Sequence, residues 1–129
     1  MNKTYKTDHV KLELQDGILL AEYFSVLIVD LELAKTIVKE RYAFTDGKQY
    51  PILLDVGHTT ELTREARIYW ASDEASKDIL AGAIITRNSV NRMIANVWLQ
   101  VNKPKVPTKL FSPNQKEQAI SWLKKVSKS

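Results

Sequence analysis

The stretch PILLDVGHTTELTREAR, residues 51–67, joins an apolar run to a polar loop and then to a predicted helix. Its first six residues, 51–56, are almost entirely apolar, which is typical of a central strand covered on both faces. Thr63 predicts the N-cap of a helix over residues 64–72, because its hydroxyl can accept from a free backbone N–H of the first turn. Glu65 suits the positive end of the helix dipole. The stretch therefore predicts a buried strand that leads into a capped helix.

A second apolar run, ILAGAIIT (79–86), has the same character and also precedes a helix start. Asn88 or Ser89 is the predicted cap of a helix that extends to about residue 101. Apolar residues recur in this helix at intervals of three and four and predict its core-facing stripe: Val90, Met93, Ile94, Val97 and Val101. We therefore expect two buried strands, near residues 52 and 82, that lie side by side in the middle of a sheet.

The rest of the chain supplies strands and helices around these two units. The alternating runs HVKLEL (9–14) and ILLAEYF (18–24), separated by Gln15-Asp16-Gly17, predict an antiparallel hairpin. A further strand is predicted at 26–30, or a continuation of the hairpin after a bulge near Ser25, and a short edge strand at 108–111. Helices are predicted at 31–45 and at 73–77. A last helix follows the capping box Ser112-Pro113-Asn114-Gln115. The order predicts one α/β domain over residues 9–129, with a mixed, mostly parallel sheet and about four helices. Residues 1–8 are predicted to be disordered or frayed.

Composition is that of an ordinary globular protein. The chain has 129 residues, of which 44% are hydrophobic and 26% charged, and this length is enough for one hydrophobic core. There is no cysteine, which excludes disulfides, thiolate nucleophiles and zinc sites built on cysteine. No apolar run approaches the ~20 residues of a membrane span. The first ten residues lack the apolar region of a signal peptide, so we expect a cytoplasmic protein.

Charge is distributed unevenly along the chain. Residues 1–80 carry ten Lys/Arg and fourteen Asp/Glu, a net charge of −4, whereas residues 81–129 carry nine Lys/Arg and the single acid Glu117, a net charge of +8. A basic C-terminal third could attract phosphate, nucleic acid or an acidic partner. Its lysines do not alternate with aromatic residues as a base-stacking surface requires. Nucleic acid is therefore not the expected partner, and we expect these lysines on the solvated surface.

Asp55 and His58 are the residues that most suggest chemistry. Asp55 ends a predicted parallel strand, where ligand sites of α/β proteins gather, and His58 follows three residues later. Two histidines are too few to indicate a metal site of three or four ligands. The four glycines form neither a dinucleotide fingerprint nor a phosphate loop. We therefore expect no cofactor, no metal and no catalytic residues, and we expect Asp55 to cap its own turn.

Aromatic residues exceed what the predicted core faces can hold. Ile68, Tyr69 and Trp70 are consecutive in one predicted helix, which cannot bury all three in one direction. Trp98 and Leu99 flank the stripe of another helix. Surplus Trp and Tyr side chains are favoured at interfaces and pockets. The alternatives are a wide apolar core face, a surface for a partner or a second copy, or an apolar ligand pocket.

The element order resembles that of the STAS domain, the fold of bacterial anti-sigma-factor antagonists. Three pieces carry the resemblance: HTTELTREAR (58–67) directly after the first apolar strand, AGAIITRNSVNRMIANVWL (81–99), and NKPKVPTKLF (102–111) before the capped last helix. The resemblance covers about residues 9–126. The chain is also similar to uncharacterised bacterial STAS-like proteins related in fold to lipid-transfer (CRAL-TRIO) domains. The resemblance implies a STAS-like α/β fold and a bacterial regulatory protein.

The STAS resemblance also allows the family's phosphorylation site to be compared with the corresponding residues of this chain. In the antagonist family, a serine in an Asp-Ser-Ser-Gly-like helix start is phosphorylated by a partner kinase. Alignment on Asp55 places Thr63 and Arg64 where Asp and Ser are expected, and Ala66 stands near the position of the Gly. The Ser-Ser-Gly site is thus absent. We expect Thr63 to serve as an N-cap, and phosphorylation of Thr59, Thr60 or Thr63 is left open.

Three functional hypotheses follow. The first is a non-enzymatic regulatory or protein-interaction domain with an unknown protein partner, in which Tyr69 or Trp70 is the apolar anchor and Arg64 and Arg67 form a charged rim. Its predicted partner-binding residues are His58, Thr60, Thr63, Arg64, Arg67, Tyr69 and Trp70. The second, suggested by the CRAL-TRIO kinship, is a small apolar ligand or lipid-binding module, with a pocket formed by Asp55, His58, Trp98 and Leu99. The third is an enzyme that uses Asp55 and His58. Self-association as a symmetric dimer, through the edge strand or the surplus aromatic residues, is a further hypothesis.

Overall fold

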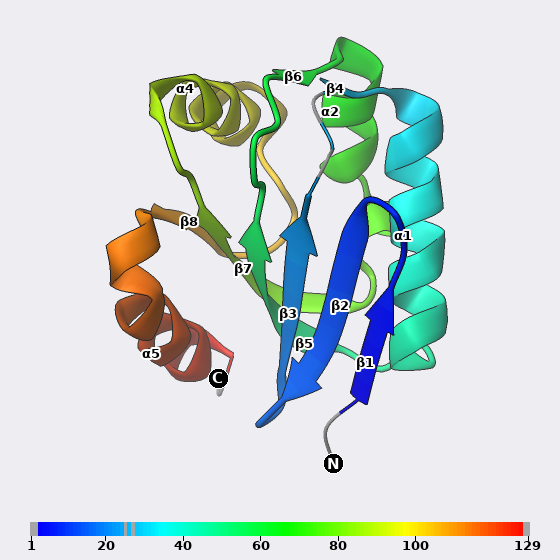
Figure 1. Ribbon diagram of the computed structural model, residues 1–129, viewed down its shortest axis with the longest axis vertical. Helices are drawn as coiled ribbons and strands as arrows, with labels where there is room; N and C mark the ends of the chain where they lie inside the picture. Colours follow the sequence, from blue (N-terminus) through cyan, green and yellow to red (C-terminus); the bar gives the residue numbers. More distant parts are fainter. Residues whose placement is uncertain (1–2, 25, 27, 128–129) are drawn as a thin grey trace.

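A six-stranded mixed sheet forms the centre of the protein in the computed structural model, which describes residues 3–24, 26 and 28–127 (Figure 1). In spatial order its strands are β1 (Lys3–Lys6), β2 (Val10–Gln15), β3 (Ile18–Tyr23), β5 (Tyr50–Asp55), β7 (Ile79–Ile85) and β8 (Thr108–Phe111). The first three strands are antiparallel, and each later strand is parallel to its neighbour. The α/β class, the pairing of the two central strands β5 and β7, and the position of β8 at an edge are confirmed.

The helices begin where the sequence predicts. They are α1 (Leu31–Thr45), α2 (Arg64–Trp70), α3 (Asp73–Ser76), α4 (Ser89–Val97), which a π-helical turn η1 (Trp98–Asn102) extends, and α5 (Lys116–Val126), which follows a 3₁₀ turn η2 (Pro113–Gln115). The side chains of Asp30, Thr63 and Asn88 each accept from the backbone N–H three residues later. Ser112 heads a capping box with Gln115. These local signals confirm the predicted starts of α1, α2, α4 and the last helix.

Helices cover both faces of the sheet (Figure 1). Because side chains alternate along a strand, Leu19 and Ile52 lie on the face covered by α1 and α2. Ile18 and Leu53 lie on the opposite face, which α5 covers with Leu123. The two faces therefore carry separate hydrophobic clusters, and the predicted sandwich of helices around β5 and β7 is confirmed.

The N-terminal region differs from its prediction. Lys3–Lys6 were expected to be frayed, but they form β1 and pair with β2. Every side chain of β1 is exposed, so no hydrophobic pattern marks the strand; backbone pairing and the bond from the Lys3 ammonium to the Phe44 carbonyl, at 2.7 Å, hold it. The expected strand at 26–30 is reduced to β4 (Ile28–Val29), which pairs with β6 (Glu61–Leu62) apart from the main sheet. The bulge expected near Ser25 lies outside the described residues.

Helix α4 turns inward only part of the predicted stripe, since Ile94 is half-buried but the other four residues are exposed. Val90, Met93, Val97 and Val101 are 42%, 60%, 37% and 68% exposed. Asn91 and Ala95 are buried instead. The Asn91 amide donates to the Thr59 carbonyl and accepts from the Arg87 N–H, and a buried amide needs such partners. These bonds fix the rotation of the helix and leave half of its apolar arc facing solvent.

Candidate functional site

The structure divides the residues of the predicted partner surface into two groups. His58, Thr60 and Arg64 are exposed, whereas Thr63, Arg67, Tyr69 and Trp70 are half-buried. The Thr63 hydroxyl accepts from the Ala66 N–H at 3.2 Å, so its predicted role as an N-cap is confirmed. The Tyr69 hydroxyl donates to Glu74 at 2.6 Å. The side chains of the second group pack partly against the protein itself.

The Trp70 side chain, one of the two expected apolar anchors beside Tyr69, packs against the core. Its indole N–H donates to the Ala34 carbonyl of α1 at 3.4 Å. Its ring centroid lies 6.1 Å from that of Tyr23 in β3. An aromatic ring held between a helix and the sheet cannot anchor a partner without leaving the core.

Asp55 and His58 do not share a cavity. The Asp55 carboxylate accepts from the Gly57 N–H at 2.9 Å, as the predicted turn cap should, and forms a two-point ion pair with Arg87. It lines an open groove beside α5, on the α5 face of the sheet. His58 is exposed and lines neither this groove nor the cavity described next. Thr59 is buried, with its hydroxyl 2.8 Å from the Val56 carbonyl.

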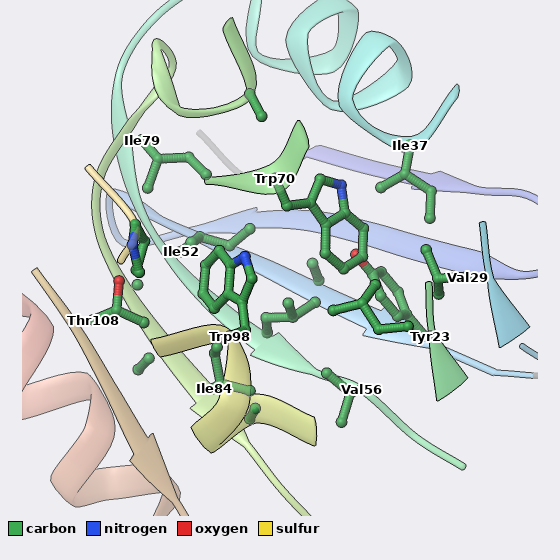
Figure 2. A pocket seen from close by; sticks show the side chains of 18 of the residues that line it. Tyr23, Val29, Ile37, Ile52, Val56, Trp70, Ile79, Ile84, Trp98 and Thr108 are labelled. Atoms are coloured by element: carbon green, nitrogen blue, oxygen red, sulfur yellow. The ribbon is translucent and has the colours of Figure 1, made fainter. Parts of the chain in front are cut away.

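A cavity of about 110 Å³ lies on the opposite face of the sheet, between the strands and helices α1, α2 and α4 (Figure 2). Figure 2 shows the indoles of Trp70 and Trp98 on its walls, and we call it the Trp70–Trp98 cavity. Other wall residues include Ile37, Ile52, Ile79 and Ile84. Ala21 and Gly82 of the sheet also line it, and their small size leaves room beneath the two indoles.

Most polar groups in the cavity wall already have partners. The Trp98 indole N–H donates to the Arg67 carbonyl at 3.0 Å, which ties η1 to α2. The Arg41 guanidinium donates to both carboxylate oxygens of Asp78, at 3.0 and 2.9 Å, and to the Ala75 carbonyl. Both side chains of this ion pair are buried, with exposed fractions of 8% and 0%. The charge of Arg41 is therefore compensated within the core.

Tyr23 is one of the polar wall residues that lack such a partner within the described part of the chain. Its side chain is buried, and burial raises the pKa of its phenol above the ordinary value, while the Arg41 guanidinium lowers that pKa by a smaller amount. The phenol therefore keeps its proton and remains a hydrogen-bond donor. Among the described residues, no hydrogen bond to this hydroxyl is present.

The structure brings only Trp98 of the predicted pocket residues to the cavity. Leu99 is half-buried and outside its lining, and Asp55 and His58 lie elsewhere. Sequence reasoning missed Tyr23 and Arg41. The alternation of β3 could have placed Tyr23 on the face of Leu19. Arg41 lies four residues after the buried Ile37, and a charged residue in an apolar helix stripe is a signal of a buried pair.

Within residues 3–24, 26 and 28–127, no three His, Asp or Glu side chains are grouped as a metal site requires. In the same residues, no helix has both the length and the apolar character needed to cross a membrane.

The chain has the fold of the SpoIIAA-like, or STAS-like, proteins. It is similar to the crystal structure of an uncharacterized protein from the DUF3478 family with a SpoIIAA-like fold, from Shewanella loihica PV-4. The TM-score is 0.61 at 16% sequence identity, and the alignment covers 92% of this chain and 98% of that chain. The predicted STAS-like fold is confirmed.

The chain belongs to the family described as a domain of unknown function, DUF7793, which matches residues 12–127. No curated protein matches the sequence. The family match spans the sheet from β2 onward and all five helices.

Proposed function

We propose that this protein is a non-enzymatic binding module whose ligand is a small apolar molecule held in the Trp70–Trp98 cavity. The single observation that carries the proposal is the cavity itself, about 110 Å³ of space between apolar walls. Protein interiors contain few voids larger than a water molecule. An engineered apolar cavity of about 150 Å³ stays dry and accepts benzene, so a cavity of this size suits a ligand of a few carbon atoms.

The character of the walls supports the proposal. An apolar ligand would gain dispersion contacts with the side chains that line this space. Both indoles are held by hydrogen bonds to helix carbonyls, so the walls do not collapse freely into the space.

An enzyme that uses Asp55 and His58 has less support. The Asp55 carboxylate is occupied by Arg87 and the Gly57 N–H, and His58 lies outside the groove that Asp55 lines. A general acid–base pair needs both groups within reach of one substrate. We therefore propose a binding function without catalysis.

The replacement Gly82→Ala tests the cavity. A Cβ at this position would meet Ile52 and Thr108 at 3.7 Å, an ordinary contact distance. Glycine inside a strand is less stable than alanine by roughly 0.5–1 kcal/mol, so the free energy of unfolding should rise by about that amount. The added methyl group occupies cavity space, and affinity for benzene, followed by NMR titration, should fall several-fold.

The matched control is Gly17→Ala at the β2–β3 turn, where a Cβ meets no atom within 4 Å. This variant should bind benzene as the parent chain does. Native mass spectrometry of protein purified from cells should also show a bound adduct that Gly82→Ala loses. Benzene that fails to bind the parent chain, or that binds Gly82→Ala equally well, would contradict the proposal.

A second candidate function is protein interaction through the solvent-facing side of α4 and η1. Its apolar surface consists of Val90, Met93, Val97 and Val101. Contiguous exposed apolar residues mark interaction sites. No Asp or Glu occurs between residues 81 and 116, whereas Arg87, Arg92, Lys103 and Lys105 do. The expected partner therefore presents an apolar segment flanked by acidic residues.

Two exposed replacements distinguish this face from the surface predicted at residues 57–70. Val101→Asp in η1 and Ile68→Asp in α2 change side chains that are 68% and 53% exposed, so each should alter the free energy of unfolding by no more than ~0.5 kcal/mol. If α4 binds the partner, co-purification from cells is lost with Val101→Asp and kept with Ile68→Asp. The opposite pattern would favour the predicted surface. Ala95→Asp, at a buried position, serves as the destabilised control.

A further inference from the structure

The hydroxyl of Tyr23 is a buried donor directed into the Trp70–Trp98 cavity. The residue is 5% exposed and lines the cavity. Figure 2 shows its oxygen beneath the indole of Trp70. Among the described residues it has no hydrogen-bond partner, although the neighbouring Trp70 and Trp98 indoles do. The hydroxyl is therefore a donor that is available to a molecule in the cavity.

Water fits this space less well than an apolar molecule. A buried water molecule typically makes about three hydrogen bonds, within a range of two to four. The cavity is lined mainly by apolar side chains such as Val29, Ile37 and Ile52. The polar side chains of Arg41, Thr59 and Asn91 in its wall already bond to other groups of the protein. A ligand that carries its own acceptor would satisfy the hydroxyl and also fill the apolar space.

The charges near Tyr23 limit which hydrogen-bond acceptor a ligand in the cavity can carry. Arg41 also lines the cavity, and its positive charge favours the negative end of a ligand dipole beside Tyr23. This guanidinium is already neutralised by Asp78 at 2.9 Å. A carboxylate ligand would therefore bring an uncompensated charge into an apolar space, which is strongly unfavourable. An uncharged acceptor avoids that penalty.

We propose that the Trp70–Trp98 cavity selects small apolar molecules that carry one uncharged carbonyl oxygen, as in a ketone, aldehyde or ester, and that Tyr23 donates a hydrogen bond to this oxygen. The inference rests on the proposed function, since it assigns the ligand class of the same cavity. Tyr23 recognises the ligand and the apolar walls hold it; no covalent step is involved.

The test uses two probes of the same shape, cyclopentanone and methylenecyclopentane, which differ in a C=O against a C=CH₂ group. Dissociation constants are measured by NMR titration for the parent chain and for Tyr23→Phe. Water solvates the ketone better than the alkene, so the two affinities cannot be compared directly. The decisive quantity is the ratio of the two dissociation constants, and the change of this ratio from the parent chain to Tyr23→Phe. A neutral hydrogen bond is worth about 0.5–1.5 kcal/mol, so Tyr23→Phe should weaken the ketone roughly two- to tenfold and leave the alkene unchanged or slightly tighter.

Ser76→Ala is the control variant. Ser76 also lines the cavity, and its hydroxyl makes no hydrogen bond within the described residues. This variant should keep the ratio of the parent chain. A ratio that changes in Ser76→Ala and not in Tyr23→Phe would overturn the assignment to Tyr23.

The outcomes separate the two proposals. If both probes bind the parent chain and Tyr23→Phe weakens them equally, the carbonyl selectivity is wrong while the apolar site stands. If neither probe binds the parent chain, both the site and its selectivity are wrong. Thermal melting of each variant, compared with the parent chain, verifies that a loss of binding does not result from unfolding.

Discussion

Replacement of Asp78 with asparagine is expected to lower the free energy of unfolding by about 3–5 kcal/mol. Asp78 is fully buried and forms two hydrogen bonds with Arg41. The amide keeps the size of the carboxylate but removes its charge. The Arg41 guanidinium is then left in the core without a counter-ion, and a buried unpaired charge is among the largest single destabilising effects. Chemical denaturation, followed by far-UV circular dichroism, measures the loss.

The Asp55–Arg87 pair provides a matched control in the same protein. It has the same two-point geometry, but its side chains are 20% and 42% exposed. Asp55→Asn keeps an oxygen that can accept from Gly57 and leaves Arg87 in contact with water. Its effect should be about 1 kcal/mol or less, since exposed pairs contribute little. Equal losses in the two variants would contradict the role assigned to burial. Addition of Arg41→Met to Asp78→Asn should restore part of the stability, because it removes the unpaired charge.

The second large effect is expected from Gly57→Ala. Gly57 has φ +59°, and a Cβ there would lie 2.1 Å from the carbonyl oxygen of Tyr23. A non-glycine residue in this left-handed region is disfavoured by roughly 1–3 kcal/mol, and overpacking adds a similar amount. We expect a total loss of about 3–5 kcal/mol in the free energy of unfolding. Since the atom in conflict belongs to the backbone, rotation of a side chain cannot relieve it.

Gly17→Ala isolates the conformational part of this effect. Gly17 has φ +78°, but an added Cβ meets nothing within 4 Å, so the loss should be limited to the strain of roughly 1–3 kcal/mol. The two variants should therefore differ by the overpacking contribution. Gly57→Ala should also shift the NMR signals of Tyr23 and of the cavity, because the backbone of β3 has to move. A Gly57→Ala variant as stable as Gly17→Ala would show that this close approach does not constrain the fold.

The parts of the fold that the sequence predicts depend on local signals. Asp30, Thr63 and Asn88 begin helices because their side chains bond to nearby backbone groups. The central pair is marked by continuous apolar runs at residues 51–56 and 79–86. By contrast, β1 has four exposed side chains and exists because its backbone pairs with β2. No periodicity in the sequence could reveal it.

The candidate site was less predictable because it depends on contacts between distant residues. The rotation of α4 is set by the bond from Asn91 to Thr59, 32 positions away. Arg41 and Asp78 are 37 positions apart. The cavity is a space between side chains of several elements, including Trp70 and Trp98. No residue type in the sequence predicts where such a space forms. The surplus of aromatic residues raised an apolar pocket as an alternative, but only Trp98 of its predicted residues lines the cavity.

The distribution of the indoles gives the molecule an optical property. Of the three tryptophans, Trp70 and Trp98 line the cavity, whereas Trp122 packs against Phe111 beneath the opposite face, with ring centroids 6.0 Å apart. Indole emission responds in wavelength and intensity to the polarity and mobility of its surroundings. Removal of the distant indole by Trp122→Phe would leave a chain whose tryptophan emission arises only from Trp70 and Trp98 in the cavity wall. Such a chain could report occupancy in a mixture of metabolites without any attached dye.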